Sequence, residues 1–287
     1  MNQELRLAAK RLAALALPEF CPRCFWYREH CGDGPFSIFP SIFNVIDLYT
    51  KKLVHSHIDT YGHPPKWMGS VFAEATGYSD PGRMSWVDED NSIQLRGSLD
   101  ALFHNQDKSR WFLGDYKTAR YSSGQDRLLP LYRMQLLAYA FLLVKSGYKK
   151  PDAAALFYFQ PPSDPTAPEL RARTEKDGFV LPLSLEVVDI ELGNFTPITD
   201  LLGQARKIYD AEDAPEGREK CRDCMRIDRY IRQSKHDSRP GEEVVAIDKV
   251  FNHRKSKWVT VFRKAEKGGD AAILDADTGE WYPDWGE

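Results

Sequence analysis

The chain has 287 residues and a formal net charge of −3, and hydrophobic residues make up 42% of it. This composition is typical of a folded globular protein, and it excludes one that coats nucleic acid through bulk positive charge, although a local basic groove is compatible with it. No apolar run is long enough to cross a membrane, and residues 1–20 are interpreted as an amphipathic helix rather than a signal peptide. We therefore expect a cytoplasmic protein.

The apolar pattern predicts helices and strands that alternate along the chain, as in an α/β protein. In chain order we expect a helix over 1–20, a Cys-rich segment at 21–34, a helix over about 40–57 and mostly loop with short elements over 60–90. A strand at 93–103, its partner at 111–119, a helix over 131–147, a strand at 153–160, a further strand or pair of strands at 179–192 and a helix over 195–209 follow. A polar linker at about 238–242 leads to alternating residues that predict a small antiparallel β appendage. The expected domains are 1–240 and 241–287.

Two aspartates and a lysine occur in the predicted pair of strands. Asp100 ends the segment Gly97–Asp100, and Asp115 and Lys117 follow in the partner strand. If the two strands form a hairpin, the three side chains meet at one edge of a sheet. Asp115 and Lys117 project from the same face because side chains alternate along a strand. The alternative is a surface hairpin with ordinary charges.

Two carboxylates held close together repel each other, and a divalent cation removes that cost. Their oxygen ligands suit Mg²⁺ or Mn²⁺, and the backbone carbonyl of Tyr116 is within reach of the same ion. Such an ion lowers the pKa of a bound water and neutralises charge at a phosphate. Lys117 would then orient the water or stabilise negative charge on the phosphate. With an ion bound, this pattern fits metal-dependent chemistry at a phosphate, while the D-x-K tripeptide by itself is a weak signal.

The helix predicted after these strands carries a polar pair on an apolar background. Gln135 and Tyr139 are four residues apart, so they share one face of the helix. From there they could lean over the metal site. In the alternative interpretation Tyr139 is a core residue and Gln135 is merely its neighbour.

The motifs GxxD, (D/E)xK and QxxxY, found in that order at Gly97–Asp100, Asp115–Lys117 and Gln135–Tyr139, resemble those of the RecB-type branch of the PD-(D/E)XK nuclease superfamily. The resemblance covers about residues 20–230. It implies a restriction-endonuclease-like core, with a central mixed sheet flanked by helices. It also implies metal at Asp100 and Asp115, Lys117 as the catalytic lysine, and Gln135 and Tyr139 as supports for the site or the DNA.

One metal ligand departs from that family pattern. RecB-type nucleases usually carry a histidine on an early helix, whereas the corresponding helix here offers Asp47. We expect Asp47 to serve as the further metal ligand. His55, His57 and Glu74 are the alternatives.

Five cysteines include two CxxC pairs, Cys21 with Cys24 and Cys221 with Cys224. In a chain without an export signal such pairs more often bind metal than form disulfides, and four thiolates suit either Zn²⁺ or an iron–sulfur cluster. The arrangement resembles the iron–sulfur RecB-type nucleases, including the CRISPR-associated Cas-four group, which implies a 4Fe–4S cluster. Those families place one cysteine before the nuclease core and three after it, so a two-plus-two site is required here. Cys31 is a possible substitute for Cys24.

We expect a DNA exonuclease or endonuclease, with single-stranded ends as the substrate that the resemblance implies. Arg222, Arg226 and Arg229 recur at near-helical spacing and predict a basic ridge for phosphates, with a solvated helix face as the alternative. Two other functions stay open. One is a CRISPR-adaptation factor that trims DNA before partner proteins integrate it, and the other is a non-catalytic nucleic-acid-binding subunit of a DNA-processing complex.

Overall fold

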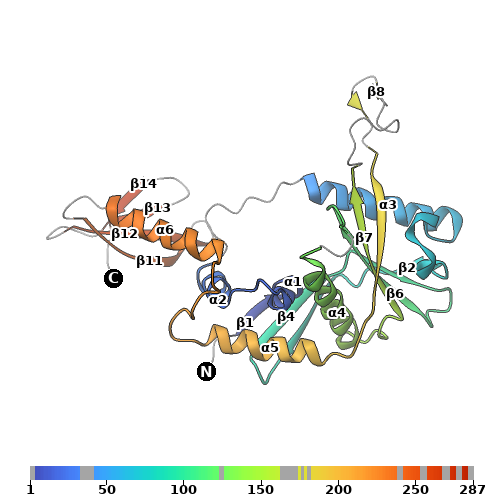
Figure 1. Ribbon diagram of the computed structural model, residues 1–287, viewed down its shortest axis with the longest axis horizontal. Coiled ribbons are helices and arrows are strands. Elements are labelled where there is room, and N and C mark those ends of the chain that lie inside the picture. The colour runs from blue at the N-terminus through green and yellow to red at the C-terminus, as the bar shows by residue number, and fades with distance from the viewer. Residues whose placement is uncertain are drawn as a thin grey trace. The chain divides into compact units, whose positions relative to one another are not determined.

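A computed structural model describes residues 4–32, 42–122, 126–161, 174–175, 178–179, 182–237, 242–252, 257–266, 272–275 and 280–283 (Figure 1). The chain divides into two compact units, Met1–Arg218 and Glu219–Glu287, and each is described by itself. None of the helices in the described ranges is both long and apolar enough to span a membrane.

A five-stranded mixed sheet forms the centre of the first unit, in the order β10-β7-β6-β5-β2. Its strands are β2 (Gly77–Tyr78), β5 (Ala101–His104), β6 (Trp111–Lys117), β7 (Ala153–Gln160) and β10 (Ser184–Ile190). Among the described strands of this sheet, only β6 and β7 run parallel to each other, and parallel neighbours need a crossover connection. Helix α4 (Leu129–Lys145) provides it. The predicted α/β core, a mixed sheet flanked by helices, is confirmed.

The sheet separates two hydrophobic cores because side chains alternate along each strand. On β6, Leu113 belongs to the core that includes α4, whereas Phe112 and Tyr116 belong to the opposite core. The α4 side also contains α1 (Ala9–Ala13) and α5 (Thr196–Tyr209). The opposite side is covered by α3 (Ile42–Tyr61) and two short 3-10 helices, η2 (Lys66–Met68) and η3 (Ser70–Phe72) (Figure 1). Odd-numbered residues of β6 thus face α4, and even-numbered ones face α3.

Two predictions about the first half of the chain are wrong. Residues expected to begin the opening helix form strand β1 (Leu5–Ala8), since Leu5 and Leu7 alternate inward and pair in parallel with β4 (Ile93–Ser98). The strand expected over 93–103 is two strands that belong to different sheets. It breaks at Leu99 and Asp100, between β4 and β5.

A second sheet of three strands has the order β1-β4-β3, with β3 (Arg83–Asp88) antiparallel to β4. β3, with η2, η3 and β2, is one of the short elements expected within the loop-rich residues 60–90. The helix predicted to end at Gly147 ends at Lys145, and Gly147 has a φ of +89°, as is common for the glycine that terminates a helix. The remaining elements of the first unit are η1 (Ala14–Ala16), α2 (Pro22–Cys31), β8 (Thr174–Glu175) and β9 (Gly178–Phe179).

The second unit contains helix α6 (Arg222–Asp237) and an antiparallel sheet. The sheet has the order β11-β12-β13-β14, with strands β11 (Glu242–Asn252), β12 (Lys257–Glu266), β13 (Ala272–Asp275) and β14 (Glu280–Pro283). The predicted β appendage is confirmed as secondary structure. Most of the predicted linker at 238–242 lies outside the described residues.

Candidate active site

Asp115 and Lys117 lie at the carboxyl end of β6 on the face toward α4. Their side chains form an ion pair between Asp115 Oδ2 and Lys117 Nζ. Both are largely removed from solvent, with 2% of the Asp115 side chain and 11% of the Lys117 side chain exposed. The ion pair follows from strand alternation, which turns residues two apart to the same side.

Asp100 reaches this pair from the turn between β4 and β5. Its Oδ2 accepts a hydrogen bond of 3.0 Å from the backbone N–H of Tyr116. The pKa of Asp100 is raised to about 7, chiefly by burial and then by the charge of Asp115 and a hydrogen bond with its carboxyl, against the opposing effects of Lys117 and the Tyr116 N–H. Without a metal ion, Asp100 therefore takes up a proton more readily than an exposed aspartate, and the nearby charge of Asp115 is one of the causes.

Helix α4 supplies a polar chain that ends on the lysine. Lys117 Nζ donates to Gln135 Oε1 at 3.3 Å, and Gln135 Nε2 donates to the Tyr139 hydroxyl at 2.7 Å. Gln135 is 4% exposed, so its amide has been taken out of water to make these two contacts. Tyr139 is also part of the hydrophobic core, and its ring packs against Gly97. The three sequence motifs thus meet in space.

Asp47 approaches from α3, on the opposite side of the sheet. It precedes the buried residue Val54 by two helical turns, so it shares the inward face of α3. Thr118, directly after β6, donates from Oγ1 to Asp47 Oδ1 at 3.1 Å. Burial raises the pKa of Asp47, while Thr118 and Lys117 lower it and Asp115 raises it. These effects place Asp47 within electrostatic range of the pair on β6.

The alternatives to Asp47 lie elsewhere. His55 stacks on the ring of Tyr78, His57 contacts the carbonyl of His63, and Glu74 pairs with Arg110. None of these contacts involves Asp100 or Asp115. Within the described residues Asp47, Asp100 and Asp115 are not gathered closely enough for one metal ion, so Asp47 stays a predicted further ligand, placed near the pair by its contact with Thr118.

A divalent cation fits the residues at the end of β6. Asp115 Oδ2 is fully buried, and within the described part of the chain it accepts no hydrogen bond, although it is ion-paired with Lys117. The charge of Asp115 also contributes to the raised pKa of Asp100, a repulsion that a bound cation would relieve. Carboxylate oxygens and a backbone carbonyl are the donors that hard divalent ions prefer.

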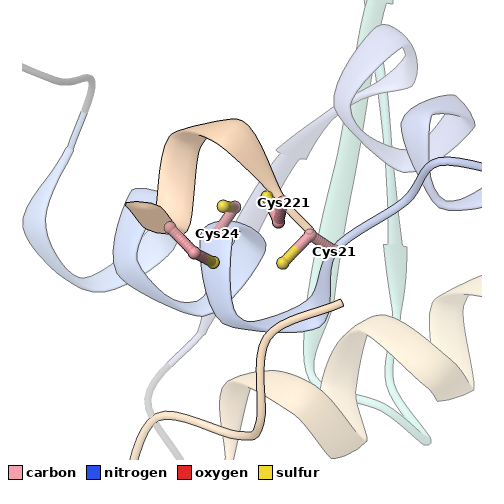
Figure 2. Close-up of side chains that lie close together, drawn as sticks. Cys21, Cys24 and Cys221 are labelled. Carbon is pink, nitrogen blue, oxygen red and sulfur yellow. The ribbon is translucent and has the colours of Figure 1, made fainter. Parts of the chain in front are cut away.

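The two CxxC pairs each occupy the first turn of a helix, α2 or α6. Cys21 is the N-cap of α2, and Cys221 immediately precedes α6. The sulfur atoms of Cys21, Cys24, Cys221 and Cys224 lie within 4.8 Å of one another, and Figure 2 shows three of these residues close together. Positive potential at a helix N-terminus favours thiolates, which are the form that binds metal. Four converging thiolates fit Zn²⁺ or an iron–sulfur cluster.

The fifth cysteine is not part of this set. Cys31 ends α2 and is exposed.

The backbone N–H of Arg218 donates to Cys21 Sγ at 3.3 Å, a contact that stabilises negative charge on sulfur. Among the described residues, the four cysteines are the only group of three or more His, Cys, Asp or Glu side chains gathered closely enough for one metal ion.

The predicted basic ridge lies in the second unit. Arg222, Arg226 and Arg229 of α6 are exposed, and Arg226 Nη1 lies 3.5 Å from Asp223 Oδ1. An exposed ion pair of this kind contributes little to stability, and it fits a solvated helix face as well as a basic ridge, so phosphate binding here stays a prediction.

A model of the PD-(D/E)XK nuclease superfamily matches residues 54–229. The chain belongs to this superfamily. The match includes Asp100, Asp115, Lys117, Gln135 and Tyr139 and ends beyond the second CxxC pair. This PD-(D/E)XK protein is accordingly a metal-dependent nuclease, and its substrate is a nucleic acid.

No curated protein matches the chain in sequence. Among solved structures, "Crystal structure of SSO0001" is similar with a TM-score of 0.40 and 12% sequence identity, over 75% of this chain and 81% of that one.

Sequence reasoning missed two neighbours of the PD-(D/E)XK site. Thr118, which holds Asp47, directly follows the DYK motif. Tyr132 lies one helical turn before Gln135, and its ring faces Lys117. The spacing of Tyr132, Gln135 and Tyr139 on one helix face was the signal that could have identified Tyr132.

Proposed function

We propose that this protein is a deoxyribonuclease of the RecB-type branch that degrades DNA from single-stranded ends. Asp100, Asp115 and the carbonyl of Tyr116 would hold Mg²⁺ or Mn²⁺, with Asp47 as a further ligand. When bound, the ion supplies Lewis acidity at the phosphate and lowers the pKa of water. The observation that carries the proposal is the meeting of two carboxyl groups, Asp115, which is buried and ion-paired with Lys117, and Asp100, which is partly buried beside it.

The residues around the carboxyl pair hold the ammonium group of Lys117 in one position. Lys117 is held by Asp115 and Gln135, and the Tyr139 hydroxyl sets which way the Gln135 amide points. A buried ammonium held in this way stabilises negative charge that develops on the phosphate, because little reorganisation is needed when the bond breaks. This arrangement favours catalysis over a role as a binding subunit.

The four cysteines would bind a 4Fe–4S cluster, for which Zn²⁺ is the alternative. The proposal rests on the thiolate set and on the similarity of the CxxC pattern to iron–sulfur RecB-type nucleases. Iron, acid-labile sulfide and zinc analysis of anaerobically purified protein separates the two. A visible absorbance band with bound iron and sulfide supports the cluster, and stoichiometric zinc without iron contradicts it.

The function is tested by cleavage of end-labelled single-stranded DNA, duplex DNA and RNA with Mg²⁺ or Mn²⁺. We expect the wild type to shorten single-stranded DNA from its ends, and Asp115→Asn and Lys117→Ala to lose cutting while they keep DNA binding. Asp90→Asn and Lys149→Ala change exposed residues and serve as matched controls. A wild-type protein that binds DNA but cuts none of these substrates would favour the binding subunit.

A further inference from the structure

Tyr132 contacts the ammonium group of Lys117 through the face of its ring. Lys117 Nζ lies 4.5 Å from the ring centroid, within the range of a cation–π interaction. Tyr132 is on α4 one turn before Gln135 and is 8% exposed. Among the described residues, the ammonium contacts Asp115, Gln135 and the Tyr132 ring.

The Tyr132 ring is itself held by β7. Tyr158 is the register partner of Lys117 on that strand, so the two side chains project to the same face of the sheet. The rings of Tyr158 and Tyr132 meet edge to face, with centroids 6.3 Å apart and an angle of 67°. The Tyr158 hydroxyl donates to Asp126 Oδ2 at 2.7 Å, which fixes that ring in turn. The surface beneath Lys117 is thus built from a strand, a helix and a loop.

The Tyr132 ring can hold the Lys117 ammonium without exchanging a proton with it. Burial, together with the charges of Asp126 and Asp115, raises the pKa of Tyr132 to about 12, so the ring is a neutral phenol at physiological pH. A neutral ring attracts an ammonium through its quadrupole and accepts no proton from it. If Asp115 binds a metal ion, its carboxylate is shared between the ion and Lys117. The position of the Lys117 ammonium then depends more on Gln135 and Tyr132.

We propose that Tyr132 is a positioning residue, whose ring holds the Lys117 ammonium against the scissile phosphate. This inference rests on the proposed nuclease function. The hydroxyl group of Tyr132 is not required for it, whereas the negative potential of the ring face is.

The contact is tested first without any substrate. In protein labelled with [ε-¹³C]lysine, the Lys117 signal is assigned by its absence from Lys117→Arg. A group above a ring face is shielded, so we expect an upfield Lys117 signal that persists in Tyr132→Phe and moves downfield in Tyr132→Leu. Tyr148→Leu removes a ring that packs on Trp111 and is the control for lost packing.

The role in catalysis is tested by single-turnover cleavage. Tyr132→Phe should keep the wild-type rate, and Tyr132→Leu should cut roughly five- to tenfold more slowly, the range expected for one cation–π contact. The Kd for DNA should not change. Because Tyr132→Leu also alters packing, phenylalanine analogues with increasing ring fluorination are placed at position 132. They preserve shape and weaken the quadrupole, so the rate should fall steadily along the series.

The outcomes separate the inference from the function on which it rests. A rate that stays constant across the fluorinated series, or a Lys117 signal that is identical in Tyr132→Phe and Tyr132→Leu, overturns the role of Tyr132. A wild type that cuts no nucleic acid refutes the nuclease and with it the catalytic part of the proposal, while the lysine signal still reports the contact.

Discussion

The ring of Tyr139 occupies the space that a side chain on Gly97 would need. A Cβ atom built on Gly97 would lie 2.9 Å from Tyr139 Cε1 and 3.0 Å from Leu142 Cδ1. The glycine of the GxxD motif therefore lets α4 pack closely on β4. Because Tyr139 also binds Gln135, this packing is linked to the position of Lys117.

Gly97→Ala should displace Tyr139 and lower the free energy of unfolding by about 1–3 kcal/mol, the usual cost of overpacking a core. Cleavage should fall as well, because Gln135 loses its support. Urea denaturation and the cleavage assay measure the two effects. Gly203→Ala is the control, since its Cβ meets no atom closer than Asn91 Oδ1 at 4.0 Å and a helical glycine gains stability on this change. Equal stability of both variants would contradict the close contact.

Asp100→Asn should stabilise the metal-free protein at alkaline pH. The folded pKa of about 7 exceeds the ordinary value of 3.8, so between these values the folded state binds the extra proton. Stability then falls as pH rises through this window, by at most about 1.4 kcal/mol per pH unit. Asn carries no charge, so this part of the slope should disappear. Urea denaturation in chelator at a series of pH values measures the slope, with Asp90→Asn as control. Parallel slopes for wild type and Asp100→Asn would refute the raised pKa.

Tyr139→Phe should slow cleavage about fivefold, the equivalent of one hydrogen bond, and leave the Kd for DNA unchanged. The ring and its packing on Gly97 remain, but Gln135 Nε2 loses its acceptor, and the amide no longer holds Oε1 toward Lys117. Single-turnover rates and DNA binding measure the two quantities. Tyr148→Phe is the matched control outside the site. A larger effect on DNA binding than on rate would instead place Tyr139 in DNA contact.

Thr118→Val should weaken binding of Mn²⁺ several-fold, because the hydrogen bond that holds Asp47 is lost while side-chain volume is kept. Asp47→Asn should weaken it further. Calorimetry or electron paramagnetic resonance of added Mn²⁺ measures affinity without cleavage. Thr60→Val is the control, because it removes an exposed hydroxyl from α3, the helix that carries Asp47, and should leave the affinity for Mn²⁺ unchanged. Unaltered affinity in Asp47→Asn would remove Asp47 from the ligand set.

Cys21→Ser and Cys224→Ser should lose the bound metal or cluster, whereas Cys31→Ser should retain it. The first two belong to the gathered set and the third is exposed outside it. Iron and zinc content per chain, with thermal unfolding, measures the loss. A Cys31→Ser protein that loses its metal would contradict the two-plus-two arrangement.

Local spacing determined much of the site from the sequence alone. Residues two apart on a strand share a face, and residues four apart on a helix share a face, so the contacts of Asp115 with Lys117 and of Gln135 with Tyr139 follow from period. The crossover helix α4 was predictable from a different signal, the length of its apolar run and the glycine that follows it, Gly147.

Tertiary structure alone decided the contacts between distant segments. Leu5–Ala8 becomes a strand because β4 offers it a partner, and the chain breaks at Asp100 because β4 and β5 join different sheets. The approach of Asp47 to Thr118 and of Tyr132 to Lys117 depends on which face of the sheet each helix covers. Sequence periodicity predicts which residues of one helix or strand share a face. Only tertiary packing determines which faces of different elements meet.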